Sequence, residues 1–318
     1  MLENKRIGVV VPAYNEEKLI GRVIETMPDF VDRIYVVDDY SSDATSERAR
    51  TYQGQKSVNG RLELIRHATN KGVGAAIITG YNKAAEEGMD AVAVMAGDAQ
   101  MDPTELERVV IPVVRGKAEY VKGNRLFTGE AWKIIPRYRY LGNSFLSLMT
   151  KIASGYWHVA DSQTGYTAIS SETIRKLDLK RLYRRYGYPN HLLTMLNVYD
   201  CRVIDVPIRP IYNIGEKSGI RLRKVIPRMS WLLLKCFLWR MKEKYIIRDF
   251  HPLIFFYALA FLLLFVSIPL FIRMIWYWYE AGHIPPINTL AFMFTSIVGM
   301  QSFFFAMWFD MDYNRKLK

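Results

Sequence analysis

This sequence has few cysteines, and its first residues do not have the pattern of a signal peptide. Only Cys201 and Cys236 occur in 318 residues, and two isolated cysteines provide neither a disulfide framework nor the spacing of a metal site. The first eight residues are charged and lack the apolar core of a signal peptide. Internal repeats and low-complexity tracts are also missing. We therefore expect a globular part that faces a reducing compartment such as the cytosol.

The charge of the chain is shifted toward lysine and arginine. It has 43 Lys and Arg against 31 Asp and Glu, a formal net charge of +12. A basic excess predicts a polyanionic partner, which is a nucleic acid, an anionic lipid or a phosphorylated substrate. From Arg209 to Arg248 the sequence holds eleven Lys or Arg and two acids, and this stretch leads straight into the apolar C-terminal part. That position favours a membrane surface over nucleic acid.

Residues 6–125 alternate between short β-branched runs and segments of helical spacing. This alternation predicts an α/β domain whose parallel sheet is covered by helices on both faces. Ligands of such sheets bind beyond the carboxyl ends of the strands, where Asp38, Asp39 and Asp98 are expected. The predicted strands are 7–11, 33–37, 62–66, 91–95, one ending before Asn124, 165–170 and 202–206. The predicted helices are 16–27, 43–50, 75–87, 104–114 and 138–152.

Two hydrophobic segments, 253–272 and 287–309, contain no charged residue. Each reaches the roughly 20 residues that cross a bilayer core, and their short connection predicts a transmembrane hairpin. The alternative is a pair of buried core helices, although such length without charge is unusual in a soluble domain. Lysines and arginines flank both outer ends of the hairpin, so both ends and both termini are expected in the cytoplasm.

The chain is therefore expected to have four parts. An α/β domain over 1–223 is followed by a basic, tryptophan-bearing amphipathic segment over 224–250, which suits the membrane interface. The hairpin occupies 251–311, and a basic cytoplasmic tail covers 312–318. The helices of a short hairpin can also associate with those of another copy, which leaves an oligomer open.

Acidic residues follow two of the predicted strands. A carboxylate at Asp38 or Asp39 can accept hydrogen bonds from a ribose or a base, while Ser41 or Asp43 can simply cap the next helix. Asp98 and Gln100 supply two oxygen ligands on one loop, which suits Mg²⁺ or Mn²⁺ shared with substrate phosphates. The alternative for this loop is a plain turn before a helix.

Two further loops carry groups that can meet an anion. Backbone N–H groups at Asn70–Gly74 precede a helix and can bind a phosphate, although a structural turn fits the same glycines. Arg125 follows the fifth strand and can clamp a diphosphate through two hydrogen bonds, although a lone arginine is more often solvated. Each of these signals is weak by itself.

In their order and spacing, these segments resemble the family 2 glycosyltransferases with a GT-A fold. The resemblance covers roughly residues 5–225, and within the family it points to dolichyl- and polyprenyl-phosphate sugar synthases. It implies a Rossmann-like nucleotide-sugar-binding domain in front of the hairpin. The matching segments are 11–17 (VPAYNEE), 36–45 (VVDDYSSDAT), 70–72 (NKG), 97–103 (GDAQMDP), 123–125 (GNR), 161–166 (DSQTGY) and 215–218 (GEKS).

The resemblance also implies roles for individual residues. Asp98 and Gln100 would hold Mg²⁺ or Mn²⁺, and Asp98 and Arg125 would be the catalytic residues. Residues implied in nucleotide-sugar binding are Pro12, Tyr14, Glu16, Asp38, Asp39, Lys71, Gly72, Asp98, Ala99, Gln100 and Arg125. Residues implied in binding the acceptor phosphate are Arg139, Asn143, Asp161, Gln163, Arg209, Lys217 and Ser218.

The sequence departs from the family pattern at Ala96, where an acidic residue usually completes an Asp-x-Asp motif. The implied reaction is an inverting transfer of a hexose from GDP-mannose, UDP-glucose or UDP-N-acetylglucosamine to dolichyl or polyprenyl phosphate at the bilayer surface. Alternatives are a glycosyltransferase that acts on polysaccharide or lipid-linked oligosaccharide, and a non-catalytic membrane scaffold that binds nucleotide sugar. The Gln-x-x-Arg-Trp motif of processive polysaccharide synthases is missing from the sequence.

Overall fold

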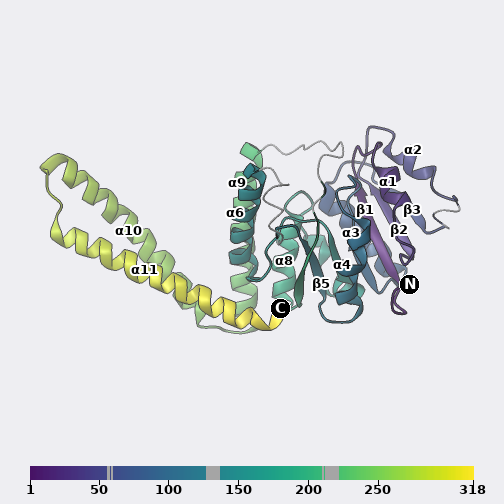
Figure 1. Cartoon of the computed structure of the whole chain (residues 1–318). Helices are drawn as coiled ribbons and strands as arrows, with labels where there is room; N and C mark the ends of the chain where they lie inside the picture. The colour runs from purple at the N-terminus through teal and green to yellow at the C-terminus, as the bar shows by residue number, and fades with distance from the viewer. Residues whose placement is uncertain (56–57, 59, 127–136, 210, 212–221) are drawn as a thin grey trace. The chain divides into compact units, whose positions relative to one another are not determined.

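The computed structural model describes residues 1–55, 58, 60–126, 137–209, 211 and 222–318. Side chains of residues 137–141, 143 and 222–225 lie outside this description. The chain forms two compact units, one made of residues 1–237 and 316–318 and the other of residues 238–315. Figure 1 shows the sheet and its helices in the first unit and a pair of long helices in the second.

A seven-stranded sheet forms the centre of the first unit. Its strand order is β3-β2-β1-β4-β6-β5-β7. The strands are β1 (Ile7–Ala13), β2 (Arg33–Asp38), β3 (Leu62–Arg66), β4 (Ala91–Val94), β5 (Tyr120–Asn124), β6 (Thr167–Ser170) and β7 (Val203–Pro207). The expected α/β fold is confirmed.

The sheet is mixed. The five strands within residues 6–125 share one direction, as predicted, and the reversed strand, β6, lies outside that range. β6 runs antiparallel to both of its neighbours, β4 and β5, whereas β5 and β7 are parallel to each other. Strand direction depends on how the chain returns from α6 (Arg137–Ser154), which hydrophobic periodicity does not report. As a result, the loop before β6 enters the sheet at the edge where β4 and β5 end.

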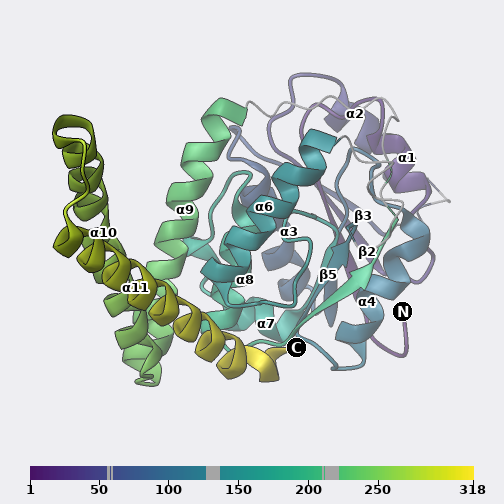
Figure 2. The ribbon, with the colours of Figure 1, turned by 60° about the vertical axis from the view of Figure 1, so that its left-hand side comes forward.

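Alternate residues of the central strands face opposite layers of helices. On one face, Ile7, Val9 and Val11 pack in a buried core cluster that includes Ile20 and Val109. On the other face, the side chain of Val10 lies against Gly80 of α3, where a Cβ would approach Val10 Cγ1 to 2.4 Å. Figure 2 shows helices on both sides of the sheet.

The helices of the first unit generally agree with the predicted segments. They are α1 (Ile20–Glu25), α2 (Thr45–Arg50), α3 (Val73–Glu86), α4 (Leu106–Val114) preceded by the 3₁₀ turn η1 (Pro103–Glu105), α6 (Arg137–Ser154), α7 (Ser171–Lys176), η2 (Leu179–Arg181), α8 (Tyr188–Val198) and the first part of α9 (Leu222–Lys242). α7 and α8 were not predicted.

The first helix begins at Ile20 instead of the predicted residue 16. The backbone N–H of Glu16 donates to Thr45 Oγ1 at 2.8 Å, and that of Glu17 donates to Asp43 Oδ2 at 3.2 Å. These bonds hold residues 16 and 17 in a loop against the start of α2. Helical spacing in the sequence could not show that contact because its partner lies about 26–29 residues away.

The second unit contains the two long apolar helices, α10 (Leu253–Ala281) and α11 (Pro286–Tyr313). Both are long and apolar enough to cross a membrane, and they extend beyond the predicted 253–272 and 287–309. They pack side by side, which completes the predicted hairpin (Figure 1). The domain limits at residues 223 and 250 stay predictions.

Charged side chains are buried where α9 ends near the end of α11. The Arg240 guanidinium donates to both oxygens of Asp310, at 2.6 and 3.0 Å, and both side chains are fully buried. Tyr245, in the π-helical turn Glu243–Arg248 (η3), donates to the same carboxylate. Lys244 Nζ donates to Asn314 Oδ1 at 2.9 Å. This cluster fastens the last turn of α11 to the end of α9.

Candidate active site at the carboxyl edge of the sheet

The sequence-predicted site residues lie mainly at one edge of the sheet. β1, β2, β4 and β5 all end there, because β5 is antiparallel to β6 and β6 is antiparallel to β4. β1 lies between β2 and β4, at the point where the strand order reverses. Open α/β sheets bind ligands in the crevice at such a switch point. The loops beginning at Tyr14 and Met95 follow β1 and β4 at this switch point.

Carboxylates from these two loops lie close to each other. The pKa of Glu16 is raised to about 7, first because the side chain is partly buried and then because the negative charges of Asp98 and Asp43 oppose its ionisation. Asp98 Oδ1 accepts the backbone N–H of Gln100 at 3.1 Å. The loops after β1 and β4 therefore bring together negative charge that a cation would stabilise.

The side-chain oxygen atoms of the loop after β4 suit a hard divalent cation. Asp98 contributes a carboxylate and Gln100 an amide, both half-buried on the loop after β4. Among the described residues, no group of three or more His, Cys, Asp or Glu side chains could hold a metal ion by itself. The residues thus fit Mg²⁺ or Mn²⁺ that completes its coordination with substrate oxygens, and do not fit a closed protein cage.

Strained backbone conformations occur in the same loops. Asn15, Tyr40 and Ala99, which follow β1, β2 and β4, all have left-handed φ angles of 57°, 67° and 55°. Such a conformation costs a non-glycine residue roughly 1–2 kcal/mol, and asparagine tolerates it better than tyrosine or alanine does. Strained residues of this kind cluster at functional sites, and no signal in the sequence identified Tyr40 or Ala99 as strained.

Asp38 and Asp39 hold neighbouring loops. Asp38 is fully buried and accepts hydrogen bonds from the Ser41 N–H, at 2.9 Å, and from the Ser46 hydroxyl. Arg66 Nε lies 3.4 Å from Asp38 Oδ2, the oxygen that also accepts from Ser46. Asp43 Oδ1 accepts the N–H of Thr45, the first residue of α2, but the N-cap position itself is Ala44, which makes no side-chain cap.

The Asp39 carboxylate organises the loop at residues 70–74. It accepts the backbone N–H groups of Lys71 at 2.9 Å and Gly72 at 2.7 Å, and it contacts His67 Nδ1 at 2.7 Å. These two amides therefore bind a carboxylate of the protein, and the prediction that they meet a phosphate is wrong here. The side chain of Lys71 is exposed at the start of α3.

Gly72 has a φ of +94°, an angle that only glycine adopts without strain. A Cβ at Gly72 would also lie 2.5 Å from the carbonyl oxygen of Arg184. The segment before α8 thus packs directly on the loop at 70–74, which keeps Lys71 in a defined place.

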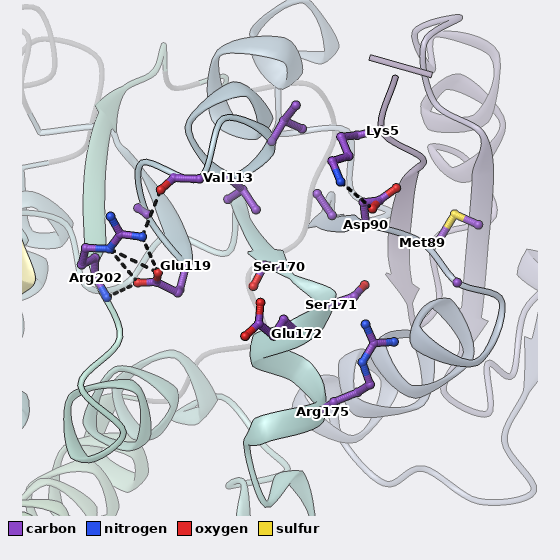
Figure 3. Close-up of a pocket in the computed structure, with 15 residues that line it drawn as sticks. Lys5, Met89, Asp90, Val113, Glu119, Ser170, Ser171, Glu172, Arg175 and Arg202 are labelled. Carbon is purple, nitrogen blue, oxygen red and sulfur yellow. Dashed lines mark hydrogen bonds and ion pairs between the residues drawn. The ribbon is translucent and has the colours of Figure 1, made fainter. Parts of the chain in front are cut away.

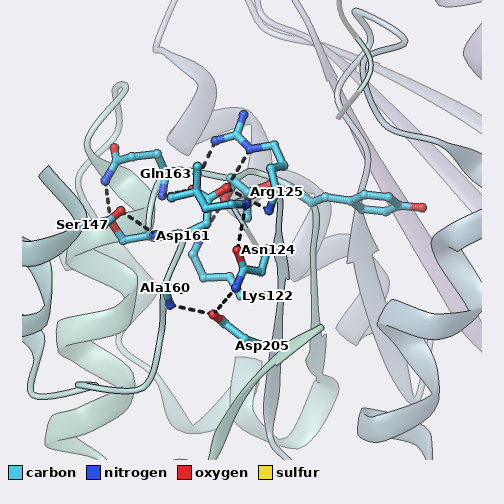
Figure 4. Close-up of polar contacts among 12 residues, drawn as sticks. Lys122, Asn124, Arg125, Ser147, Ala160, Asp161, Gln163 and Asp205 are labelled. Carbon is cyan, nitrogen blue, oxygen red and sulfur yellow. Dashed lines mark hydrogen bonds and ion pairs between the residues drawn. The ribbon is translucent and has the colours of Figure 1, made fainter. Parts of the chain in front are cut away.

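Arg125 follows β5 and is ion-paired with a buried carboxylate. Its Nε lies 2.7 Å from Asp161 Oδ2 and its Nη2 lies 3.2 Å from Asp161 Oδ1 (Figure 4). Asp161 is fully buried and precedes β6, and the Arg125 side chain is 21% exposed. The guanidinium charge holds the pKa of Asp161 below its ordinary value, against the effect of burial.

Asp161 and Gln163 were predicted to bind the acceptor phosphate, but their described contacts are within the protein. Asp161 Oδ1 also accepts the N–H of Gln163 at 3.1 Å, and Gln163 Nε2 donates to Asn190 Oδ1 at 2.9 Å. A buried carboxylate repels a phosphate, so the prediction for Asp161 is wrong as a direct contact. Its observed partner is the Arg125 guanidinium.

The remaining acceptor residues are only partly described. Arg209 is exposed just after β7, and its N–H donates to Glu105 Oε2 at 2.8 Å. The backbone of Arg139 and Asn143 lies in α6, but their side chains are outside the described residues, as are Lys217 and Ser218 entirely. Their roles stay predictions.

The opposite edge of the sheet carries a separate hollow of about 440 Å³ (Figure 3). Its lining includes two ion pairs, Lys5 with Asp90 and Arg202 with Glu119. It lies where β4, β5 and β7 begin, far from the strand ends at which Glu16, Asp98 and Arg125 are placed. This hollow is therefore distinct from the candidate active site.

Comparisons with known proteins agree with the fold. The family description Glycosyl transferase family 2 matches residues 8–178. The chain is 32% identical over 221 residues to the UDP-N-acetylglucosamine–dolichyl-phosphate N-acetylglucosaminyltransferase of Methanococcus voltae, which covers 66% of this chain and 88% of the relative. It is 27% identical over 234 residues to the polyprenol monophosphomannose synthase of Mycolicibacterium smegmatis, covering 71% and 86%.

Among solved structures, a similar fold occurs in glucosyl-3-phosphoglycerate synthase from Mycobacterium tuberculosis, crystallised with Mn²⁺, UDP and glucosyl-3-phosphoglycerate. The TM-score is 0.52 at 20% identity, over 74% of this chain and 80% of the other. Fold and site together define a GT-A sugar-transferring enzyme. The chain belongs to glycosyltransferase family 2, and it is a hexosyltransferase.

Proposed function

We propose that this enzyme transfers a hexose from a nucleoside-diphosphate sugar to a polyprenyl phosphate at a membrane surface. The observation that carries the proposal is the pair of facing loops at the switch point, where Glu16 and Asp98 place carboxylates next to each other. The names of the two relatives support both substrate classes, and the apolar hairpin supports a lipid acceptor.

The donor is proposed to lie across the carboxyl ends of β1, β4 and β5. Tyr14 is half exposed after β1 and offers its ring to the nucleoside, and Lys71 offers a cation beside it. Asp98 and Gln100 would hold Mg²⁺ or Mn²⁺, which when bound neutralises the oxygens of the donor diphosphate. β6 separates β4 from β5, so the loops carrying Asp98 and Arg125 start about 10 Å apart, a gap that a diphosphate and its sugar can fill.

The acceptor phosphate is its own nucleophile. A phosphate monoester has a second pKa near ~6, so at neutral pH it is largely a dianion and needs no strong general base. One of its oxygens forms a bond to the anomeric carbon while the bond from that carbon to the diphosphate breaks, with inversion. Arg125 stabilises the negative charge that develops on the leaving diphosphate.

The membrane part is proposed to hold the enzyme at the bilayer that contains the lipid acceptor. α10 and α11 would anchor the chain, with both outer ends of the hairpin in the cytoplasm because basic residues flank them. Lys242 and Arg248 lie just before α10, and Arg315 and Lys316 follow α11.

The test is transfer of labelled sugar from nucleotide sugars to polyprenyl phosphate by Asp98→Asn enzyme in membranes. Loss of a carboxylate ligand should reduce transfer by at least ~100-fold, because charge on the diphosphate is no longer neutralised. Asp102→Asn is the matched control, because Asp102 caps the turn at Thr104 and asparagine caps as well. Full activity of Asp98→Asn would refute the proposed metal site, and a chain inactive with every donor would favour the non-catalytic scaffold.

A further inference from the structure

Lys122 is a charged residue in the middle of strand β5, whose other residues are uncharged. It is fully buried, and its Nζ donates to the carbonyl oxygen of Thr164 at 2.7 Å. A buried ammonium is unfavourable unless opposite charges compensate it. The position carries no sequence motif that points to a role, so the fold has to supply the reason for this lysine.

Two carboxylates, one fully buried and one partly buried, lie near Lys122 on neighbouring segments. Asp205 of β7 lies opposite Lys122 in the parallel register, and Asp161 lies in the loop before β6 (Figure 4). Both negative charges favour the protonated form of Lys122, while Arg125 opposes it. The lysine is therefore the second cation, beside Arg125, in a cluster of two carboxylates.

The second carboxylate is held in place by the protein backbone. Asp205 Oδ2 accepts the N–H of Ala160 at 2.6 Å and the amide of Asn124 at 3.2 Å. Its other oxygen has no hydrogen-bond partner among the described residues. These bonds join β7, the end of β5 and the segment leading to Asp161, so the charges keep fixed relative positions.

The ion pair of Arg125 with Asp161 competes with the proposed role of Arg125 at the donor. The Nε and Nη2 of Arg125 are committed to Asp161, yet the proposed reaction needs the guanidinium at the donor diphosphate. Turning the guanidinium away would leave Asp161 buried without its strongest partner, which is a large penalty for a carboxylate. A second cation near Asp161 lowers that penalty.

We propose that Lys122 is a positioning residue that compensates the charge of Asp161 when Arg125 turns toward the donor diphosphate. The inference rests on the proposed role of Arg125. Lys122 does not touch the substrates. It acts through Asp161, and the charge of its ammonium is what matters, more than its volume.

The test compares Lys122→Met, Lys122→Gln and Lys122→Arg in full-length enzyme, with steady-state transfer measured from pH 6.5 to 9.5. Methionine removes the charge at similar volume, and glutamine also keeps a donor for Thr164. Both should lower kcat by about 10-fold or more while leaving KM for the lipid acceptor unchanged. Arginine keeps the charge and should retain most of the activity.

The pH profile separates this role from simple packing. Burial lowers the pKa of Lys122 to about 8 despite the carboxylates of Asp161 and Asp205. Wild-type kcat should therefore fall as pH rises through 8, while Lys122→Met has a low and flat profile and Lys122→Arg stays active to pH 9.5. A wild-type profile that is flat from pH 7 to 9.5 overturns the inference, whether or not the variants fold.

Arg125→Gln distinguishes the two proposals. If Arg125→Gln is inactive while Lys122→Met has wild-type kcat, the inference about Lys122 fails and the proposed function stands. If Arg125→Gln is fully active, the diphosphate clamp itself is wrong. Folding of each variant is checked by thermal unfolding in detergent, and a loss of kcat in unfolded protein does not count as support.

Discussion

At the scale of single residues, the active edge shows two uses of the same chemical group. The Asp39 carboxylate accepts hydrogen bonds from two backbone amides and contacts His67. The Asp98 carboxylate instead lies beside another carboxylate, that of Glu16. The first arrangement satisfies the charge within the protein. The second leaves negative charge that a cation would stabilise, which supports the proposed metal site at Asp98.

A substitution at Ala96 tests directly whether the site at Asp98 needs a cation. Ala96 lies half-buried two residues before Asp98, where family members usually carry an acid. Ala96→Asp adds a third oxygen ligand and should lower the Mn²⁺ concentration for half-maximal transfer by about 10-fold. Ala96→Ser is the control for size and polarity. An unchanged metal requirement would mean that residue 96 points away from the metal.

Asp205 predicts a pH dependence of stability. Burial raises its pKa from 3.8 to about 6, so the native state keeps this proton at a pH where the unfolded state has lost it. The free energy of unfolding should therefore fall as pH rises from about 4 to 6, by a total on the order of 2–3 kcal/mol. Above pH 6 the titration of Asp205 should cause no further decrease.

Asp205→Asn removes that titration while keeping an acceptor for the Ala160 N–H. Its free energy of unfolding, measured by denaturant titration in detergent, should lack the decrease between pH 4 and 6. Identical slopes for both proteins would show that Asp205 is not the group that titrates.

At the scale of elements, the end of α9 and the end of α11 are held by a buried ion pair. Asp310→Ala would leave Arg240 buried without its carboxylate, which typically costs about 3–5 kcal/mol. The double variant Arg240→Met with Asp310→Leu should recover most of that loss, because a well-packed apolar pair replaces both charges. Thermal unfolding in detergent measures the three variants. Equal stability of Asp310→Ala and wild type would contradict the buried-pair account.

At the scale of the whole molecule, the orientation of the hairpin decides which lipid leaflet the enzyme serves. Both native cysteines are buried, so single added cysteines report accessibility cleanly. In sealed vesicles, His283→Cys in the connection and Lys318→Cys at the tail should react with an impermeant maleimide from opposite sides. Reaction of both from one side would contradict the spanning hairpin.

Local signals in the sequence were enough for much of the fold. β-branched runs, helical spacing and two uncharged stretches predicted the five parallel strands up to Asn124 and both hairpin helices, because side-chain periodicity and hydrophobic length are properties of short segments. The same signals located Asp98, Gln100 and Arg125 at strand ends. They failed for α1, whose predicted first turn is held in a loop by Asp43 and Thr45.

What the tertiary structure alone decided depends on partners far apart in the chain. The antiparallel direction of β6 brings Asp161 to Arg125, 36 residues away, and the register with β7 sets Asp205 beside Lys122. Asp39 captures the amides of Lys71 and Gly72 across more than 30 residues. Periodicity carries no information on such pairings, because they arise only when strands choose neighbours and directions in a closed, hydrogen-bonded sheet.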